Sequence, residues 1–290
     1  MSLRSPLRTL IALASLASAA LLVPLAAPAY AASAYVLTTF KGDAAADQEL
    51  WVYSSGNATS FDPLVDTNYR GPTGALRDPS VIRHNGAYYI AYTVQSWTTQ
   101  SRQFAIARST DLRTWSHVAT VEAGVPGVAY TWAPEFLVEG GTVRVVVSVG
   151  GADYRFTPYV YTASDASLTS WSAPRALGIP GNHIDTFILK PGAWTYNAFV
   201  KNETTKYIEH WTSTNLTDWT DHGTLFASGH EGPSLLRQPD GRFRIFVDRY
   251  PTSGMWTATS ADLWSWTSLS AVACSGCRHG TVLYDTGFAG

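Results

Sequence analysis

The chain has 290 residues, a net charge of −2 and a charged fraction of only 14%. A chain without a basic surplus is not expected to bind nucleic acid, which requires a positively charged face. Eleven tryptophans and fifteen tyrosines are many for this length. Aromatic side chains favour strands and also offer flat apolar surfaces to sugars. The composition therefore points to a β-rich protein with an oligo- or polysaccharide partner.

The first thirty-one residues are expected to form a secretory signal peptide. Arg4 and Arg8 precede an apolar, alanine-rich stretch over residues 10–25, and residues 29–31 (AYA) form a small-x-small cleavage site. A signal anchor is the alternative for the same apolar run. No later stretch is apolar for long enough to span a bilayer. We predict an extracellular, bacterial and monomeric protein that leaves the membrane after cleavage.

A short motif recurs four times at a spacing of about fifty residues. Each copy places a tryptophan after a Ser/Thr-Asp/Asn turn: Trp115 in ARSTDLRTWS, Trp171 in TASDASLTSWS, Trp219 in WTSTNLTDWT and Trp266 in TATSADLWSWT. A glycine-containing hairpin followed by an aromatic or β-branched strand precedes each copy, as in HNGAYYIAYT and PDGRFRIFVD. Units of this length with about four strands each are typical of β-propeller blades.

A fifth unit is split between the two ends of the chain. ELWVYSSGNATSFDPL near the N-terminus resembles the outer two strands of a blade, and RHGTVLYDT near the C-terminus resembles an innermost strand. The sequence therefore predicts an all-β fold, a single five-bladed β-propeller over residues 32–290. Its N- and C-terminal strands are expected to share the fifth blade. A two-sheet sandwich is the alternative, but it would not explain the repeat.

The chain contains two cysteines, Cys274 and Cys277, in the sequence CSGC. In an exported protein a local disulfide is the expected state, and Ser-Gly between the cysteines allows a tight turn. A redox motif is the alternative, although no βαβ pattern surrounds it. Two thiols are too few for a structural zinc site.

Five residues at the starts of the innermost strands are expected to converge on the axis of the propeller. These strands open with RDPSVIR, WAPEFLV, HIDTFIL, HEGPSLLR and RHGTVLY, and the matching residues are Asp78, Glu135, Asp185, Glu231 and His279. Like charges gathered in a poorly solvated place destabilise a fold, so this cluster indicates chemistry or cation binding. Glycoside hydrolysis requires such paired carboxyl groups, and crowding keeps one of them protonated near neutral pH.

At these positions the chain resembles glycoside hydrolase family 43, the five-bladed propeller arabinanases, arabinofuranosidases and xylosidases. The resemblance rests on RDPS, WAP, HIDTF, EGPSLL and RHGT in blade order and covers essentially the whole mature chain. It implies that Asp78 is the general base, Asp185 orients and tunes the acid, and Glu231 is the general acid. Because the family inverts configuration, Asp78 and Glu231 are expected roughly 6.5–9.5 Å apart.

The resemblance also has implications for a metal ion. His279 is similar to the axial histidine that, in many members, lies near or helps to coordinate a calcium or another central ion. No cofactor is expected to be required. Calcium prefers oxygen ligands, so the imidazole alone does not define its site.

Further residues beside the carboxyl groups are expected to contact the substrate. Trp132 could stack on a sugar ring, and Arg77, His183 and Arg278 could bind hydroxyl groups or charges. Glu135 is expected in the wall of the site, where the family usually has aspartate. Thr186 also departs from the family pattern, since proline is common after the third-blade aspartate.

We therefore expect a secreted, inverting, exo-acting α-L-arabinofuranosidase that acts on plant arabinan or arabinoxylan. The alternatives within the family are a furanosidase for galactofuranose or D-arabinofuranose, a β-xylosidase and an endo-arabinanase. A non-catalytic sugar-binding propeller could use the same aromatic residues, but binding alone does not require Asp78 and Glu231. A retaining relative, such as the fructan-cleaving propellers, would differ in the configuration of the first-formed sugar.

Overall fold

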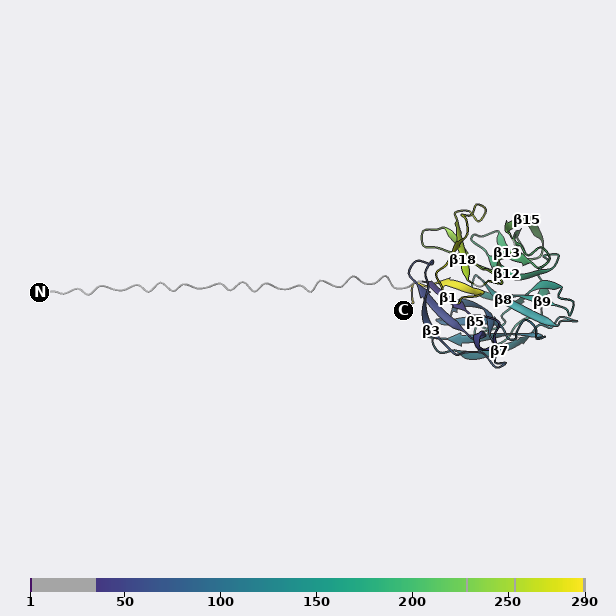
Figure 1. Ribbon diagram of the computed structural model, residues 1–290, viewed down its shortest axis with the longest axis horizontal. Helices are drawn as coiled ribbons and strands as arrows, with labels where there is room; N and C mark the ends of the chain where they lie inside the picture. Colours follow the sequence, from purple (N-terminus) through teal and green to yellow (C-terminus); the bar gives the residue numbers. More distant parts are fainter. Residues whose placement is uncertain (2–34, 228, 253, 289–290) are drawn as a thin grey trace. The chain divides into compact units, whose positions relative to one another are not determined.

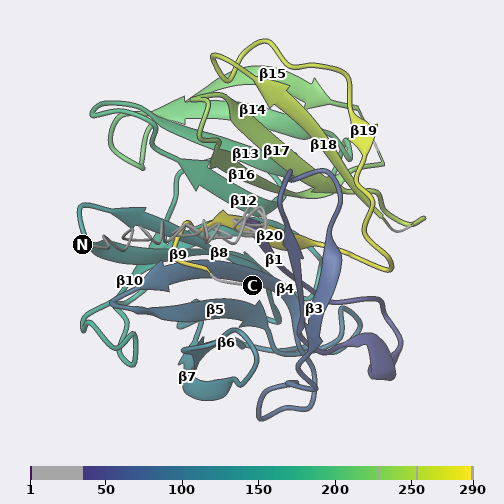
Figure 2. The same cartoon turned by 90° about the vertical axis from the view of Figure 1, so that its left-hand side faces the viewer.

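The computed structural model describes Met1 and residues 35–227, 229–252 and 254–288. Its strands form five four-stranded antiparallel sheets (Figures 1 and 2), which confirms the five-bladed β-propeller. The predicted signal peptide lies outside the described residues, apart from Met1, and stays a prediction. Among the described residues, no helix is long and apolar enough to cross a membrane.

Each blade runs from an innermost to an outermost strand. The first blade contains β4 (Arg77–His84), β5 (Ala87–Thr93), β6 (Gln103–Ser109) and β7 (Ser116–Glu122). The second contains β8 (Tyr130–Glu139), β9 (Thr142–Gly150), β10 (Phe156–Thr162) and β11 (Arg175–Ala176). The third contains β12 (His183–Leu189), β13 (Tyr196–Asn202), β14 (Ile208–Ser213) and β15 (Trp219–Phe226). The fourth contains β16 (Glu231–Arg237), β17 (Phe243–Asp248), β18 (Met255–Ser260) and β19 (Ser270–Ala271).

The fifth blade joins the two ends of the chain. Its order is β20 (Gly280–Tyr284), β1 (Tyr35–Thr39), β2 (Trp51–Ser55) and β3 (Asp62–Asp66), and a short 3-10 turn, η1 (Ala45–Asp47), follows β1. Strand β20 pairs antiparallel with β1, so hydrogen bonds between the two ends close the ring. Cys274 and Cys277 form a disulfide just before β20, which confirms the predicted bridge.

The apolar core lies between consecutive blades. Clusters of buried side chains combine residues of two neighbouring blades, and the four repeat tryptophans pack against them. In three blades the indole bonds to its own turn: in the first blade, Ser109 Oγ accepts the amide of Leu112 at 2.8 Å, and Trp115 Nε1 donates to the carbonyl of Leu112 at 3.0 Å. Trp219 Nε1 instead donates to the carbonyl of Leu177, just after β11, at 2.8 Å. The repeat predicted from the sequence is therefore a structural device of the inter-blade core.

A bulge interrupts the innermost strand of four blades close to its start. The pairing with the second strand shifts there, and the residue inside the bulge has a positive φ. The bulged residues are Asp78 at φ 50°, Ala133 at 46°, Asp185 at 53° and Gly232 at 57°. The predicted alignment is corrected accordingly: Asp78 and Asp185 are equivalent, whereas Glu135 lies two residues after its bulge and Glu231 one residue before. Spacing in the sequence does not reveal these offsets, because a bulge changes the alternation of side chains.

Candidate active site

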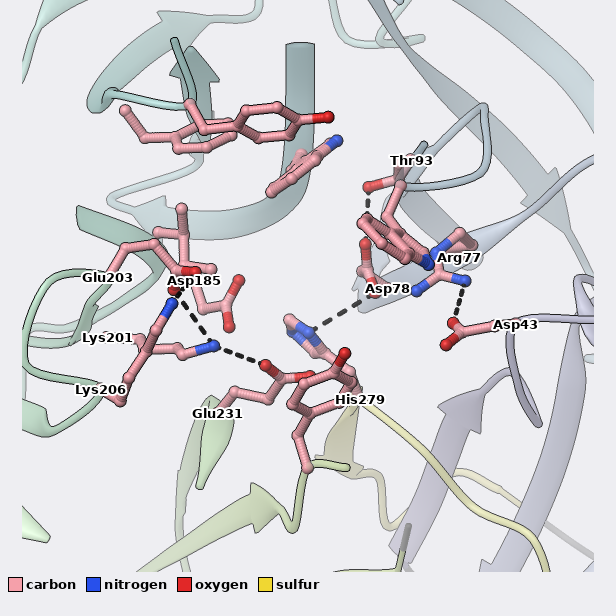
Figure 3. Close-up of a pocket in the computed structure, with 16 residues that line it drawn as sticks. Asp43, Arg77, Asp78, Thr93, Asp185, Lys201, Glu203, Lys206, Glu231 and His279 are labelled. Atoms are coloured by element: carbon pink, nitrogen blue, oxygen red, sulfur yellow. Dashed lines mark hydrogen bonds and ion pairs between the residues drawn. The ribbon is translucent and has the colours of Figure 1, made fainter. Parts of the chain in front are cut away.

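The innermost strands begin around a cavity of about 280 Å³ (Figure 3). Six of the residues predicted for the site line it: Arg77, Asp78, Trp132, Asp185, Glu231 and His279. The other lining residues are Asp43, Thr93, Trp97, Tyr154, Phe156, Ile184, Lys201, Glu203, Lys206 and Tyr250. The cavity thus brings together three of the predicted carboxyl groups, from the first, third and fourth blades.

Asp78 occupies the bulge of β4 and presents its carboxyl group to the cavity. Thr93, on the neighbouring strand β5, donates a hydrogen bond from Oγ1 to Oδ2 of Asp78 at 2.8 Å. The other oxygen, Oδ1, lies 3.6 Å from Nδ1 of His279. Arg77 also lines the cavity and pairs with Asp43 at 2.7 Å. A carboxylate fixed in this way could accept a proton from a water molecule in the cavity.

Glu231 begins β16, and Figure 3 shows its carboxyl group and that of Asp78 on either side of the His279 ring. Lys201 Nζ donates to Glu231 Oε2 at 2.6 Å, and Arg278 Nη2 lies 3.5 Å from Oε1. Arg278 is itself anchored, since its Nε donates to Asp248 at 2.7 Å. Two buried cations therefore hold one carboxyl group at the cavity wall.

Asp185 connects the third and fourth blades. Its backbone amide donates to Ser148 Oγ at 3.1 Å, and its Oδ2 accepts the amide of Gly232 at 3.0 Å. Burial, reinforced by neighbouring carboxylates, raises the pKa of Asp185 to about 7 against the opposing charge of His279. Asp185 therefore holds the residue next to Glu231 through a hydrogen bond between the two blades.

His279 lies among the carboxyl groups as a buried cation. Its Nδ1 is 3.6 Å from Asp78 and its Nε2 is 3.6 Å from Glu135 Oε1. Burial alone lowers the pKa of His279, but Asp185, Glu135 and Asp78 outweigh it and raise the pKa to about 10. At neutral pH the imidazolium is therefore the counter-ion of the carboxyl groups around the axis.

The residues around His279 do not fit the calcium site that the family resemblance implies. In the part of the chain that the structure describes, no three His, Cys, Asp or Glu side chains are grouped to hold a metal ion. Calcium takes six to eight oxygen ligands. The carboxyl group of Glu135 faces His279 with one oxygen and the Thr281 hydroxyl, at 3.2 Å, with the other.

Three predicted substrate contacts, Glu135, His183 and Arg278, do not line the cavity. Glu135 is 1% exposed and faces His279, and Arg278 is 5% exposed and paired with buried Asp248. His183 is 2% exposed, and its Nε2 lies 3.0 Å from a carboxylate oxygen of Glu209. These predictions are corrected: Glu135 is buried against His279, and Arg278 and His183 are each buried against a carboxyl group, so none of the three side chains lines the cavity.

Aromatic side chains at the rim were not predicted from the sequence. Trp97, Tyr154 and Tyr250 line the cavity and remain 44%, 41% and 42% exposed. Each lies on a loop between the second and third strands of its blade, where no alternation of residues predicts which way a side chain points. Deeper in the cavity, Trp132 stacks on Phe156 with ring centroids 4.4 Å apart. These residues could have been predicted from the blade topology, which places the loops between the second and third strands beside the start of the innermost strands.

Lys201 was also missed, although the sequence carries a signal for it. It stands near the end of the otherwise largely apolar strand YNAFVKN (β13), and the blade fold brings this end of the strand to the cavity. Its side chain is 7% exposed. A lysine in such a strand requires a carboxylate partner, and Glu231 is that partner.

Solved structures of family 43 glycoside hydrolases share the fold. The exo-beta-1,3-galactanase 1,3Gal43A from Clostridium thermocellum matches with a TM-score of 0.55 and 14% identity, over 67% of this chain and 48% of that chain. The GH43_1 enzyme from Xanthomonas citri, complexed with xylotriose, matches with a TM-score of 0.55 and 16% identity, over 68% and 73% of the two chains. A mutant of the GH43 protein BlXynB from Bacillus licheniformis matches with a TM-score of 0.53 and 19% identity, over 72% and 44%.

This chain spans about half the length of the galactanase that it matches, and at these identities the similarity shows the fold alone. A comparison with curated proteins gives no significant match. The model of a family related to glycosyl hydrolase family 43, described as "Probable glycosyl hydrolase domain", matches residues 30–286. That match covers nearly all of the described propeller, including each carboxyl group of the cavity. The chain therefore belongs to this glycosyl hydrolase family related to family 43.

Proposed function

We propose that the chain is a secreted, inverting, exo-acting glycosidase that removes α-L-arabinofuranosyl residues from plant arabinan or arabinoxylan. The observation that carries the proposal is the placement of Asp78 and Glu231 in one cavity, on either side of the His279 ring. A base and an acid on opposite sides of a sugar are what inversion requires. A sugar-binding module has no need of this arrangement.

In the proposed reaction, Asp78 takes a proton from a water molecule while the oxygen of that water attacks the anomeric carbon. Glu231 gives a proton to the glycosidic oxygen as the bond between that oxygen and the anomeric carbon breaks. The products are a free sugar of inverted configuration and the shortened glycan. Thr93 and His279 hold the base, Lys201 and Arg278 hold the acid, and Asp185 fixes the backbone beside the acid through Gly232.

The size of the cavity supports exo action. Its volume of about 280 Å³ lies just below the ~300–1,000 Å³ that small-molecule sites span. A space of this size suits one terminal sugar better than several consecutive units of a polysaccharide. Trp97 and Tyr250 at the rim offer apolar faces to the remainder of the glycan.

Product analysis tests the reaction. Purified protein is incubated with 4-nitrophenyl α-L-arabinofuranoside, the corresponding β-xyloside and galactofuranosides, and with arabinan and arabinoxylan. We expect arabinose to be released, with proton NMR detecting the β-anomer first. Release of a different sugar would contradict the proposed arabinofuranoside substrate, and retention of configuration would overturn the inverting mechanism. Binding without release would identify a sugar-binding propeller.

The Glu231→Ala variant tests the assignment of the acid. Loss of general-acid catalysis is expected to lower kcat by about 10²–10⁴-fold on substrates with a poor leaving group. A 2,4-dinitrophenyl glycoside, whose leaving group needs no proton, should recover much of this loss. Equal losses on both substrates, in a variant that unfolds at the wild-type temperature, would contradict the role of Glu231.

A further inference from the structure

In four blades, one residue of the second strand pairs with the same position of the innermost strand. In each of these blades it lies opposite the residue that directly precedes the bulge, which in the fourth blade is Glu231. These second-strand residues are Thr93, Ser148, Lys201 and Asp248. All four are buried. Because the register is the same in each blade, their side chains can be compared directly.

In three of the blades this residue accepts a hydrogen bond from a backbone amide at the start of the next blade. The contacts are Ala133 N to Thr93 Oγ1 at 2.9 Å, Asp185 N to Ser148 Oγ at 3.1 Å, and His279 N to Asp248 Oδ2 at 3.1 Å. We call this contact the inter-blade clasp. It satisfies an amide that the bulge or the strand entry removes from regular pairing, so its role in these blades is structural.

The third blade departs from the pattern, because Lys201 has no acceptor atom to offer. The amide that the clasp would bind belongs to Gly232, and Asp185 Oδ2 accepts it instead at 3.0 Å. Lys201 points its ammonium group at a side chain of the next blade, Glu231, at 2.6 Å. Figure 3 shows Lys201 with contacts to Glu231 and to Glu203, whose Oε2 lies 3.2 Å from Nζ. The clasp function has thus moved to Asp185, and Lys201 is left to contact the carboxyl group in the cavity.

We propose that Lys201 is a positioning residue of the reaction: it holds the Glu231 carboxyl group against the cavity and stabilises its negative charge as the proton leaves. This inference rests on the proposed function of Glu231 as the acid. A hydrogen-bonded ammonium ion favours the ionised form of a carboxyl group, most strongly where water is excluded. Burial alone lowers the pKa of Lys201, but Glu231, Asp185 and Glu203 outweigh it and raise that pKa, so the group stays charged.

The test compares Lys201→Met, Lys201→Arg and a matched control, Lys190→Met. Lys190 is a partly exposed lysine that follows β12 in the same blade and pairs with Glu139, away from the cavity. We expect Lys201→Met to lower kcat about 10²-fold on a poor leaving group and much less on 2,4-dinitrophenol. The alkaline limb of its pH–rate profile should move up by about one pH unit. Lys201→Arg should restore most of both properties, and Lys190→Met should change neither.

A purely structural role for Lys201 would lower kcat equally for all leaving groups and leave the pH–rate profile unchanged, which would overturn the proposal. A ¹³C NMR titration of the Glu231 carboxyl group, in protein without substrate, gives a readout that does not need turnover. Its midpoint should rise in Lys201→Met and stay unchanged in Lys190→Met. If the wild-type protein released no sugar, the proposed function would fail, whereas an unchanged titration midpoint would specifically refute the action of Lys201 on Glu231.

Discussion

The cavity where the innermost strands begin, about 280 Å³, is lined by carboxyl groups and cations as well as aromatic rings, whereas a second cavity of about 270 Å³, further along the same strands, has few charged residues in its lining. The second cavity is lined by Ser80, Val81, Ile82, Phe136, Phe187, Leu235, Leu236, Arg237, Thr281, Val282, Leu283 and Tyr284. The two cavities are nearly equal in size and both are lined by the innermost strands, so their different chemistry must come from the residues that line them.

The difference between the two ends arises from strand pairing. At the far end the pairing is regular up to the hairpin, as from Ser80 opposite Ala91 to His84 opposite Ala87 in the first blade. At the entrance, bulges break the alternation and place Asp78 and Asp185 in a left-handed conformation that aspartate tolerates better than most residues. Catalytic chemistry is thus expected only where the pairing is interrupted, and stability is expected to depend more on the regular end.

The largest expected effect separates the two ends by activity. Asp78→Asn keeps the shape of the side chain and its contact with Thr93, but it removes the proposed base. We expect kcat to fall by about 10²–10⁴-fold, while the variant still unfolds in one cooperative transition. Steady-state kinetics on the aryl glycoside and a thermal unfolding curve measure the two properties.

Leu235→Ala is the counterpart at the far end. Leu235 is buried, lines the second cavity and packs in the core between the third and fourth blades. Its truncation should cost about 2–5 kcal/mol of unfolding free energy, with kcat of the folded protein unchanged. A loss of kcat comparable to that of Asp78→Asn would show that the two ends of the strands are coupled.

A smaller effect is expected from a glycine beside the site. Gly232 has a φ of +57°, and a Cβ atom there would lie 2.6 Å from the buried His279 ring. Gly232→Ala should therefore displace His279 and lower kcat by about 10- to 100-fold. It should also cost at least ~1–2 kcal/mol of stability for the backbone conformation.

Gly241→Ala provides the control for the backbone term. Gly241 has a φ of +85°, but its Cβ would meet nothing closer than Arg237 Nη2 at 3.8 Å. This variant should lose stability without losing activity. If both variants kept full activity, the contact between Gly232 and His279 would have no part in maintaining the site.

The fold was predictable from the sequence because its signals are local. Each repeat tryptophan follows a turn whose hydrogen bonds involve residues at most a few positions apart, such as Ser109 with Leu112, and the split fifth blade follows from counting these units. The placement of the carboxyl groups of Asp78, Asp185 and Glu231 at the cavity was predictable for the same reason, since each stands in a short motif at the start of a strand.

The remainder of the site depends on contacts between blades, which no local pattern specifies. Glu135 and Arg278 were themselves predicted to contact the substrate, but they are buried against His279 and Asp248. Lys201 reaches the site because β13 ends beside the next blade. Which way a side chain turns at a bulge is determined by the neighbouring blade, and the sequence of one strand does not contain that information.

The last expected effect is on the pH dependence of stability, in which His279 at the axis and the outer turns should differ in sign. The pKa of His279 rises from 6.5 to about 10 on folding. Its contribution to stability is fully present below pH 6.5 and is lost as the pH rises towards 10. Amides of Ser265 and Trp264 lower the pKa of Asp262, in the turn of the fourth blade, below its usual 3.8. That contribution is present above pH 3.8 and is lost as the pH falls.

Urea unfolding midpoints between pH 2 and pH 10 test both signs. The wild-type midpoint should fall from pH 7 to pH 10, and His279→Gln, although less stable at neutral pH, should show a flatter alkaline limb because the titrating cation is gone. Asp262→Asn should flatten part of the acid limb and leave the alkaline limb unchanged. The turn itself should be retained, because an amide oxygen can accept the same backbone hydrogen bonds, as Asn215 does in the equivalent turn of the third blade. An alkaline limb that is equally steep in His279→Gln would mean that another group carries the high-pH loss, and the charge assigned to the axis would then be wrong.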